Sequence, residues 1–126
     1  MKIKRFDHIV IPVCDIMKTI HFYENVLCMK VERRNNRYAV HFGQQKINFH
    51  TYPREFQPAA ENPTYGSADI CLQAEGSIKE IREELVSKGV TIELGIVRRQ
   101  GAIGPIDSIY LRDPDNNLIE ISTPAE

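Results

Sequence analysis

The sequence predicts an α+β fold in which two βαβββ repeats form a curved, eight-stranded mixed sheet. The first observation behind this is an internal match: shifting the chain by 61 positions places Ile9–Ile11 on Ile70–Leu72 without a gap. The second is the order of apolar patterns, in which a strand pattern, a helical pattern and further strand patterns occur twice. The length of 126 residues suits one domain, so we expect a single domain over 1–126.

The first repeat is predicted to span residues 4–52. Phe6–Val13 is rich in β-branched residues, as strands are. Asp15 is a suitable N-cap for a helix whose apolar residues recur in helical steps. The pattern then predicts a strand, an Asn35-Asn36 turn and a hairpin, at Met29–Arg34, Tyr38–Phe42 and Lys46–Tyr52.

The second repeat is predicted to span residues 66–124, after a connecting loop at 53–65 that contains three prolines. Ser77 with Glu80 three residues later is the capping-box pattern of a helix start, and Gly89 is placed to end that helix. The predicted strands are Ser67–Ala74, Val90–Leu94, Ser108–Arg112 and Asn117–Ser122. Arg98–Pro105 is expected to be irregular, and residues 113–116 to form a turn.

Composition excludes several classes of partner. The formal net charge of -1 gives no electrostatic reason to expect a nucleic-acid partner. No apolar run approaches the roughly 20 residues of a membrane span, so no membrane partner is expected. The three cysteines have no CxxC spacing and suit reduced thiols. We therefore expect a cytoplasmic protein.

Four titratable residues are predicted to share the open side of the sheets. Side chains alternate along a strand, so the buried partners Ile9, Ile47, Ile70 and Ile119 imply which neighbours face away from the helices. Those neighbours include four that can ligate a metal ion: His8, His50, Asp69 and Glu120. Two imidazoles with carboxylates suit Ni, Zn, Mn, Co or Fe(II). A hydrogen-bonded polar network is the alternative, and His21 and His41 are expected to be structural.

The sequence resembles the vicinal-oxygen-chelate superfamily, which contains glyoxalases, bleomycin-resistance proteins and extradiol dioxygenases. The resemblance rests on Phe6–Ile11, on Phe22-Tyr23 and on the ending Asp113–Ile121. Phe42–His50 and Gly66–Leu72 further resemble the glyoxalase-domain-containing-protein-5 type, whose bacterial members include virulence-associated proteins. The likeness covers nearly the whole chain.

This resemblance implies metal ligands on the first, fourth, fifth and last strands, which here carry His8, His50, Asp69 and Glu120. Glyoxalase I has His, Glu, His and Glu on these strands, so this chain keeps the composition and exchanges the middle pair. No organic cofactor is implied. The superfamily also implies a small-molecule substrate and a homodimer, with a site built from one chain or from two.

The leading functional hypothesis is a metal-dependent lyase or isomerase of glyoxalase type, similar to lactoylglutathione lyase, acting on a substrate with vicinal oxygens. A carboxylate would move a proton between neighbouring carbons, with Glu120 as the first candidate and Asp69 as the second. Tyr110 and Arg112 are candidates for substrate contacts. One alternative is a non-haem Fe(II) ring-cleaving dioxygenase that uses His8, His50 and Glu120. The other is a non-catalytic small-ligand-binding or resistance protein.

Overall fold

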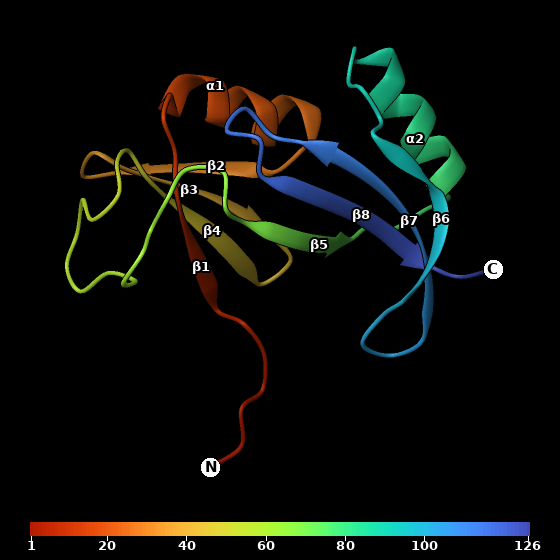
Figure 1. Ribbon diagram of the computed structural model, residues 1–126, viewed down its shortest axis with the longest axis horizontal. Helices are drawn as coiled ribbons and strands as arrows, with labels where there is room; N and C mark the ends of the chain where they lie inside the picture. Colours follow the sequence, from red (N-terminus) through yellow and green to blue (C-terminus); the bar gives the residue numbers. More distant parts are fainter. The chain divides into compact units, whose positions relative to one another are not determined.

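The computed structural model describes all 126 residues and divides them into two compact units, Met1–Ser67 and Ala68–Glu126 (Figure 1). Each unit contains one of the two predicted repeats and one four-stranded mixed sheet. The α+β class and the repeated βαβββ order are thereby confirmed. The eight strands are hydrogen-bonded as two sheets of four, not as one continuous ladder. That the two repeats form a single domain stays a prediction.

The first unit is a sheet with strand order β1-β4-β3-β2, covered on one face by a helical segment. Strands β1 and β4 are parallel, and the other neighbours are antiparallel. Its elements are β1 (His8–Pro12), α1 (Ile16–His21), the π-helical turn η1 (Phe22–Val26), β2 (Lys30–Arg34), β3 (Arg37–Phe42) and β4 (Gln45–His50).

The core of this unit lies between the helical segment and the covered face of the sheet. Tyr23 is fully buried and its ring lies 5.0 Å from that of Phe49 on β4. Ile11 and Ile47, on the same face as Phe49, are also buried. Burying such side chains stabilises the fold by about 1.5–3 kcal/mol each. The opposite face of the sheet is left open for polar residues.

Capping and turn residues act in the first unit as the sequence predicts. The Asp15 carboxylate accepts hydrogen bonds from the backbone N–H groups of Met17 and Lys18, both at 3.1 Å, and so begins α1. Asn35 and Asn36 both have positive φ, 51° and 60°, which a two-residue hairpin turn between β2 and β3 requires. These local choices fix where β2 and β3 pair.

The second unit repeats this plan with strand order β5-β8-β7-β6. Strands β5 and β8 are parallel, and β7 is antiparallel to both its neighbours. Helix α2 packs against β7, and its N-cap Ser77 accepts a hydrogen bond from the Glu80 N–H at 3.5 Å. The elements are β5 (Asp69–Gln73), α2 (Ile78–Ser87), β6 (Leu94–Gln100), β7 (Pro105–Arg112) and β8 (Leu118–Pro124).

One predicted strand is wrong in position. Val90–Leu94 was expected to be a strand and Arg98–Pro105 irregular, whereas β6 begins at Leu94 and continues to Gln100. Arg98 pairs with Asp107 in the ladder and also forms an ion pair with it at 2.7 Å. Because β6 is an edge strand, its polar side chains remain in solvent and give no alternating apolar pattern. Only a short loop, closed by a hydrogen bond from Gly101 N–H to Gly104 C=O, separates β6 from β7.

The turn before β8 ties together the start of both parallel strands. Asp113 accepts hydrogen bonds from the N–H groups of Asp115 and Asn117, each at 2.9 Å. The buried Asn117 amide donates to Asp113 at 2.8 Å and accepts from the Ala68 N–H at 2.8 Å, next to β5. The residues that carry the clearest family resemblance thus have a structural role, which sets the register of β5 against β8.

Candidate functional site

The open face of the first sheet carries both predicted histidine ligands. His8 and His50 lie on the same side of β1 and β4 as Val10 and Asn48, opposite the buried Ile47. The parity argument for these two residues therefore agrees with the strand register. Parity, however, says only which face a residue is on and not where along the strand it meets its neighbour.

The register separates the two imidazoles. His8 pairs with Lys46, while His50 pairs with Pro12, four residues further along β1. Four residues of strand span about 13 Å, and side chains stand roughly perpendicular to the sheet, so the rings are separated by a similar distance. A metal ion binds an imidazole nitrogen at about 2.0–2.1 Å. The first unit therefore does not bring His8 and His50 to one metal ion.

The two predicted carboxylates of the second sheet are, by contrast, close neighbours. Asp69 pairs with Leu118 and Cys71 pairs with Glu120, so Asp69 and Glu120 are offset by two residues on adjacent strands. Their α-carbons are then about 8 Å apart, from two residues at about 3.3 Å and one strand spacing of about 4.8 Å. Both project from the open face, where flexible carboxylates at this spacing can share one ligand.

Comparison of the two registers identifies a residue that sequence analysis missed. Glu120 lies opposite Cys71 on β5, and the matching pair in the first unit is Asn48 opposite Val10. Asn48, and not His50, thus occupies the place in the first repeat that Glu120 occupies in the second. The signal was present in the sequence, because Ile47-Asn48-Phe49 and Ile119-Glu120-Ile121 share the same apolar–polar–apolar pattern.

Glu120 is half-buried and held by a neighbouring hydroxyl. The Ser108 hydroxyl on β7 donates a hydrogen bond of 2.6 Å to Glu120 Oε2, which leaves Oε1 for another partner. A cavity of about 450 Å³ opens beside it on the same sheet, with Cys71, Arg99 and Ser122 in its lining. Burial raises the pKa of the Cys71 thiol, so this thiol is protonated at neutral pH and is a weak nucleophile.

His8 has a carboxylate partner of its own. Its Nδ1 lies 2.7 Å from Asp7 Oδ1, and this hydrogen bond lowers the pKa of Asp7. A carboxylate that accepts from one ring nitrogen fixes the tautomer and presents the other nitrogen as a ligand. Asp7 is exposed, so solvent weakens the electrostatic part of this pairing.

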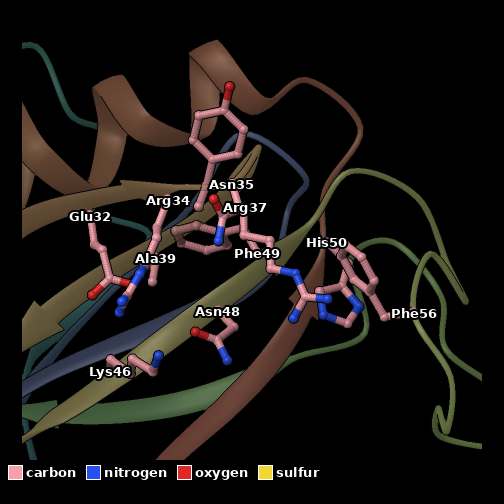
Figure 2. A pocket seen from close by; sticks show the side chains of 11 residues that line it. Glu32, Arg34, Asn35, Arg37, Ala39, Lys46, Asn48, Phe49, His50 and Phe56 are labelled. Carbon is pink, nitrogen blue, oxygen red and sulfur yellow. The ribbon is translucent and has the colours of Figure 1, made fainter.

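His50 lies in a separate setting, a cavity of about 280 Å³ on the first sheet (Figure 2). Its ring meets the edge of Phe56 at 5.0 Å, and the guanidinium of Arg37 lies 3.9 Å from the centre of the same ring. Burial, and to a smaller extent the charge of Arg37, lowers the pKa of His50 against the opposing influence of Glu55. His50 is accordingly neutral at pH 7.

Three further residues were assigned from parity. Tyr110 does face the open side of the second sheet, where its hydroxyl accepts a hydrogen bond from Arg99 at 3.0 Å. Arg112 is engaged by both carboxylate oxygens of Glu93 at 3.0 Å, which favours a structural role. His41 shares the face of His50, contrary to the parity argument, but its imidazole is hydrogen-bonded to Glu32 at 2.9 Å.

The sequence profile of the "Glyoxalase/Bleomycin resistance protein/Dioxygenase superfamily" matches residues 5–121, nearly the whole chain. The chain belongs to this superfamily. It is 50% identical over 123 residues to virulence protein STM3117 of Salmonella typhimurium, covering 97% of this chain and 85% of that protein. It is 44% identical to glyoxalase domain-containing protein RDO1 of Mycosarcoma maydis, covering 98% of this chain and 70% of that protein. The predicted resemblance to the virulence-associated type is thereby confirmed.

Solved structures of superfamily members agree with the fold. An integron cassette protein from V. cholerae superposes with a TM-score of 0.95 at 47% identity, covering 99% of this chain and 98% of that one. More distant solved structures share the fold alone. They include lactoylglutathione lyase from Agrobacterium tumefaciens, at 17% identity and TM-score 0.75, and TnmS3, an antibiotic binding protein from Streptomyces, at 18% and 0.76. The same fold therefore occurs in an enzyme and in an antibiotic binding protein.

The residues of this chain fit a divalent metal ion in part. Within neither unit do three or more His, Cys, Asp or Glu side chains gather closely enough to hold one ion. The second unit offers two carboxylates, Asp69 and Glu120, and the first offers the carboxylate-oriented imidazole of His8. Carboxylates and imidazole are the ligands that Mn, Fe(II), Ni and Zn accept in proteins.

Proposed function

We propose that this chain is a metal-dependent enzyme of glyoxalase type, a lyase or isomerase that acts on a small substrate with vicinal oxygens. The observation that supports it best is the pair Asp69 and Glu120, two carboxylates on the open face of adjacent strands, of which Glu120 lines a cavity. Asp69 begins β5 and Glu120 lies within β8, two residues apart in the register of these parallel strands. Their chemistry suits metal binding and proton transfer.

In this proposal Asp69 and Glu120 of the second unit are metal ligands, and His8 of the first unit is kept as the ligand that the family resemblance implies. His8 occupies the strand position in the first repeat that Asp69 occupies in the second, as the 61-residue offset shows. His50 is left out of the set, because the register places it about 13 Å along the strand from His8. When bound, a divalent ion such as Ni, Zn, Mn, Co or Fe(II) supplies Lewis-acid polarisation of the neighbouring oxygens of the substrate.

Glu120 is proposed as the group that moves the proton. Ser108 donates to Oε2, so Oε1 is the oxygen proposed to accept a proton from a carbon next to a carbonyl. The same carboxyl can return the proton to the neighbouring carbon. Ser108 is a positioning residue, since it acts on the substrate only through Glu120.

Metal binding is tested first on the full chain stripped with a chelator. Isothermal titration with Mn, Zn and Ni should give one site per chain, and Glu120→Gln, Asp69→Asn and His8→Gln should each weaken it by about 10–100-fold. Glu32→Gln is the matched control, because it removes a carboxylate that is bonded to His41 on the other sheet. Absence of stoichiometric binding would contradict the proposal and favour a non-catalytic ligand-binding protein.

The effect of substituting His50 on metal binding distinguishes the ring-cleaving dioxygenase from the glyoxalase-type enzyme. That reaction needs His8, His50 and Glu120 on one Fe(II), so His50→Gln would then abolish metal binding, whereas the present proposal expects little change. Oxygen uptake with Fe(II) would favour the dioxygenase. Turnover of the hemithioacetal of methylglyoxal and glutathione without oxygen uptake would support the glyoxalase type directly.

We also propose a cytoplasmic homodimer, as superfamily membership suggests. None of the helices is long and apolar enough to cross a membrane, and none of the three cysteines forms a disulfide. Sedimentation equilibrium of the purified chain, at 14.5 kDa per protomer, measures the oligomeric state. A monomer at all concentrations would contradict the dimer.

A further inference from the structure

We propose that the cavity on the first sheet is a binding site for a small organic carboxylate that carries a flat apolar group. None of the proposed metal ligands lines this cavity, and the proposal does not rest on the proposed enzymatic function. Its walls come from β2, β3, β4 and the loop after β4, all in the first unit, and it holds about 280 Å³ (Figure 2). A cavity of this size suits a ligand of about ten heavy atoms, smaller than a typical drug-sized molecule.

Positive charge dominates this cavity. Arg34, Arg37 and Lys46 line it, and Glu32 is the one carboxylate in the lining. The Glu32 carboxylate is engaged by His41 at 2.9 Å, which lowers the pKa of Glu32 and keeps it ionised. Three cations therefore face one anion, and the excess favours a ligand with a negative charge.

Arg37 has the geometry of a carboxylate receptor. Its guanidinium stacks on the Phe56 ring at 3.9 Å, and no carboxylate or carbonyl of the protein accepts a hydrogen bond from it. Stacking occupies the flat face of the guanidinium and leaves its N–H edges free, which is the geometry that pairs with both oxygens of a carboxylate. A cation held in place by an aromatic ring loses less side-chain freedom when it binds an anion.

Asn48 and His50 supply further polar groups beside the guanidinium. Both side chains project from β4 into the cavity, and Figure 2 shows the His50 imidazole next to the Arg37 guanidinium. Neither side chain has a hydrogen-bond partner within the protein. Asn48 and His50 can therefore donate to a bound carboxylate at no cost in protein hydrogen bonds.

The apolar part of the ligand is expected at the floor and rim. Ala39 is 2% exposed at the floor, where its small side chain leaves the hollow open. Phe56 forms the rim, and its loop is held by a hydrogen bond of 2.6 Å from Thr51 N–H to the Glu55 carboxylate. A flat apolar group between Ala39 and Phe56 places its carboxylate at Arg37, which is why the ligand class is an apolar carboxylate and not a free inorganic anion.

Amide chemical-shift titration of the full chain, with chelator present, tests the site with benzoate as the probe. Benzoate should shift resonances of β3, β4 and Phe56 saturably. The neutral isostere benzamide should bind more weakly than benzoate, by roughly tenfold or more. Arg37→Met should weaken benzoate binding by roughly tenfold or more, and Arg37→Lys by less, since it keeps the charge and loses the two-pronged geometry.

Arg33→Met is the matched control. Arg33 lies on β2, pairs with Tyr38 and projects from the face of the sheet opposite to Arg37, so this variant removes a positive charge that does not line the cavity. Three results would overturn the proposal: equal benzoate affinity of the Arg37→Met and Arg33→Met variants, equal binding of benzamide, or shifts confined to the cavity around Arg99 on the second sheet. Because metal is absent throughout, failure here is distinct from failure of the metal titration.

Discussion

At the scale of single residues, His50 lies on the open face of the first sheet, as predicted, but its surroundings differ from those of a metal ligand. Its imidazole packs against Phe56 beside the Arg37 cation, and both burial and that charge disfavour protonation. The pKa of His50 in the folded chain is therefore below that of the unfolded chain. This difference links folding stability to pH.

The lowered pKa of His50 predicts the direction in which folding stability changes with pH. Below the unfolded pKa, near 6.5, the unfolded chain binds a proton at His50 that the folded chain does not, so His50 makes stability fall as pH falls. We expect His50→Gln to lose less stability than the natural chain between about pH 7 and pH 5. Urea unfolding across this range measures it. His21→Gln, which replaces an exposed imidazole on α1, is the control, and identical slopes for both variants and the natural chain would contradict the assignment.

Residue-scale reasoning from sequence was right about the faces of the four candidate ligands, wrong about the face of His41 and incomplete about neighbours. Alternation placed His8, His50, Asp69 and Glu120 correctly on open faces, because Ile47 and Ile119 mark the buried sides unambiguously. It could not show that Glu120 corresponds to Asn48, since parity is unchanged when a strand slips by two residues. The register that decides this depends on pairing between strands, which no single strand encodes.

At the scale of elements, the turn before β8 is the strongest local determinant of the second sheet. Asn117 is fully buried and satisfies both Asp113 and the Ala68 N–H. Asn117→Ala removes the two hydrogen bonds that its side chain makes to the buried Asp113 and to the half-buried Ala68 N–H, and we expect a loss of about 2–4 kcal/mol of unfolding free energy. Asn116→Gly is the control, because its φ of 67° suits glycine. Chemical denaturation measures both, and a comparable loss in the two variants would contradict the role of Asn117.

Strand β6 depends on a glycine that the sequence pattern did not single out. Gly95 has φ of 122° at a register shift between β6 and β7, and an added Cβ would lie 2.6 Å from the Ser108 carbonyl oxygen. We expect Gly95→Ala to cost about 2–3 kcal/mol, since backbone must move. Gly43→Ala, at φ 55° with open space around it, should cost about 1 kcal/mol. Thermal unfolding compares them, and equal costs would show that the contact with Ser108 is relieved easily.

Elements that begin with a side-chain cap were predictable, and the edge strand was not. Asp15 and Ser77 bond to backbone groups two or three residues ahead, so their effect is local and visible in the sequence. Strand β6 is defined by pairing with β7, and its Arg98-Arg99-Gln100 end carries no apolar alternation. Predictions from pattern therefore fail where an element is stabilised by its ladder partner rather than by burial.

At the scale of the whole molecule, the internal repeat predicts one cooperative domain although the chain divides into two compact units. Each unit has about sixty residues and a single four-stranded sheet, a size at which isolated domains are marginally stable. If neither unit is stable in isolation, the folded state of each repeat depends on the other being folded. Folding would then be all-or-none over both repeats.

Hydrogen exchange followed by mass spectrometry tests this cooperativity in the natural chain and in two variants. If the chain is one domain, Ile47→Val in β4 should speed the exchange of the slowest amides in both sheets, and by the same factor in each sheet. Asn117→Ala before β8 should also affect the two sheets equally, with a factor of its own. Ile47 and Asn117 are both fully buried, so each variant weakens only its own repeat directly. Faster exchange confined to the repeat that carries the substitution would show two independent folding units, because a destabilised repeat can open alone only when the other is stable without it.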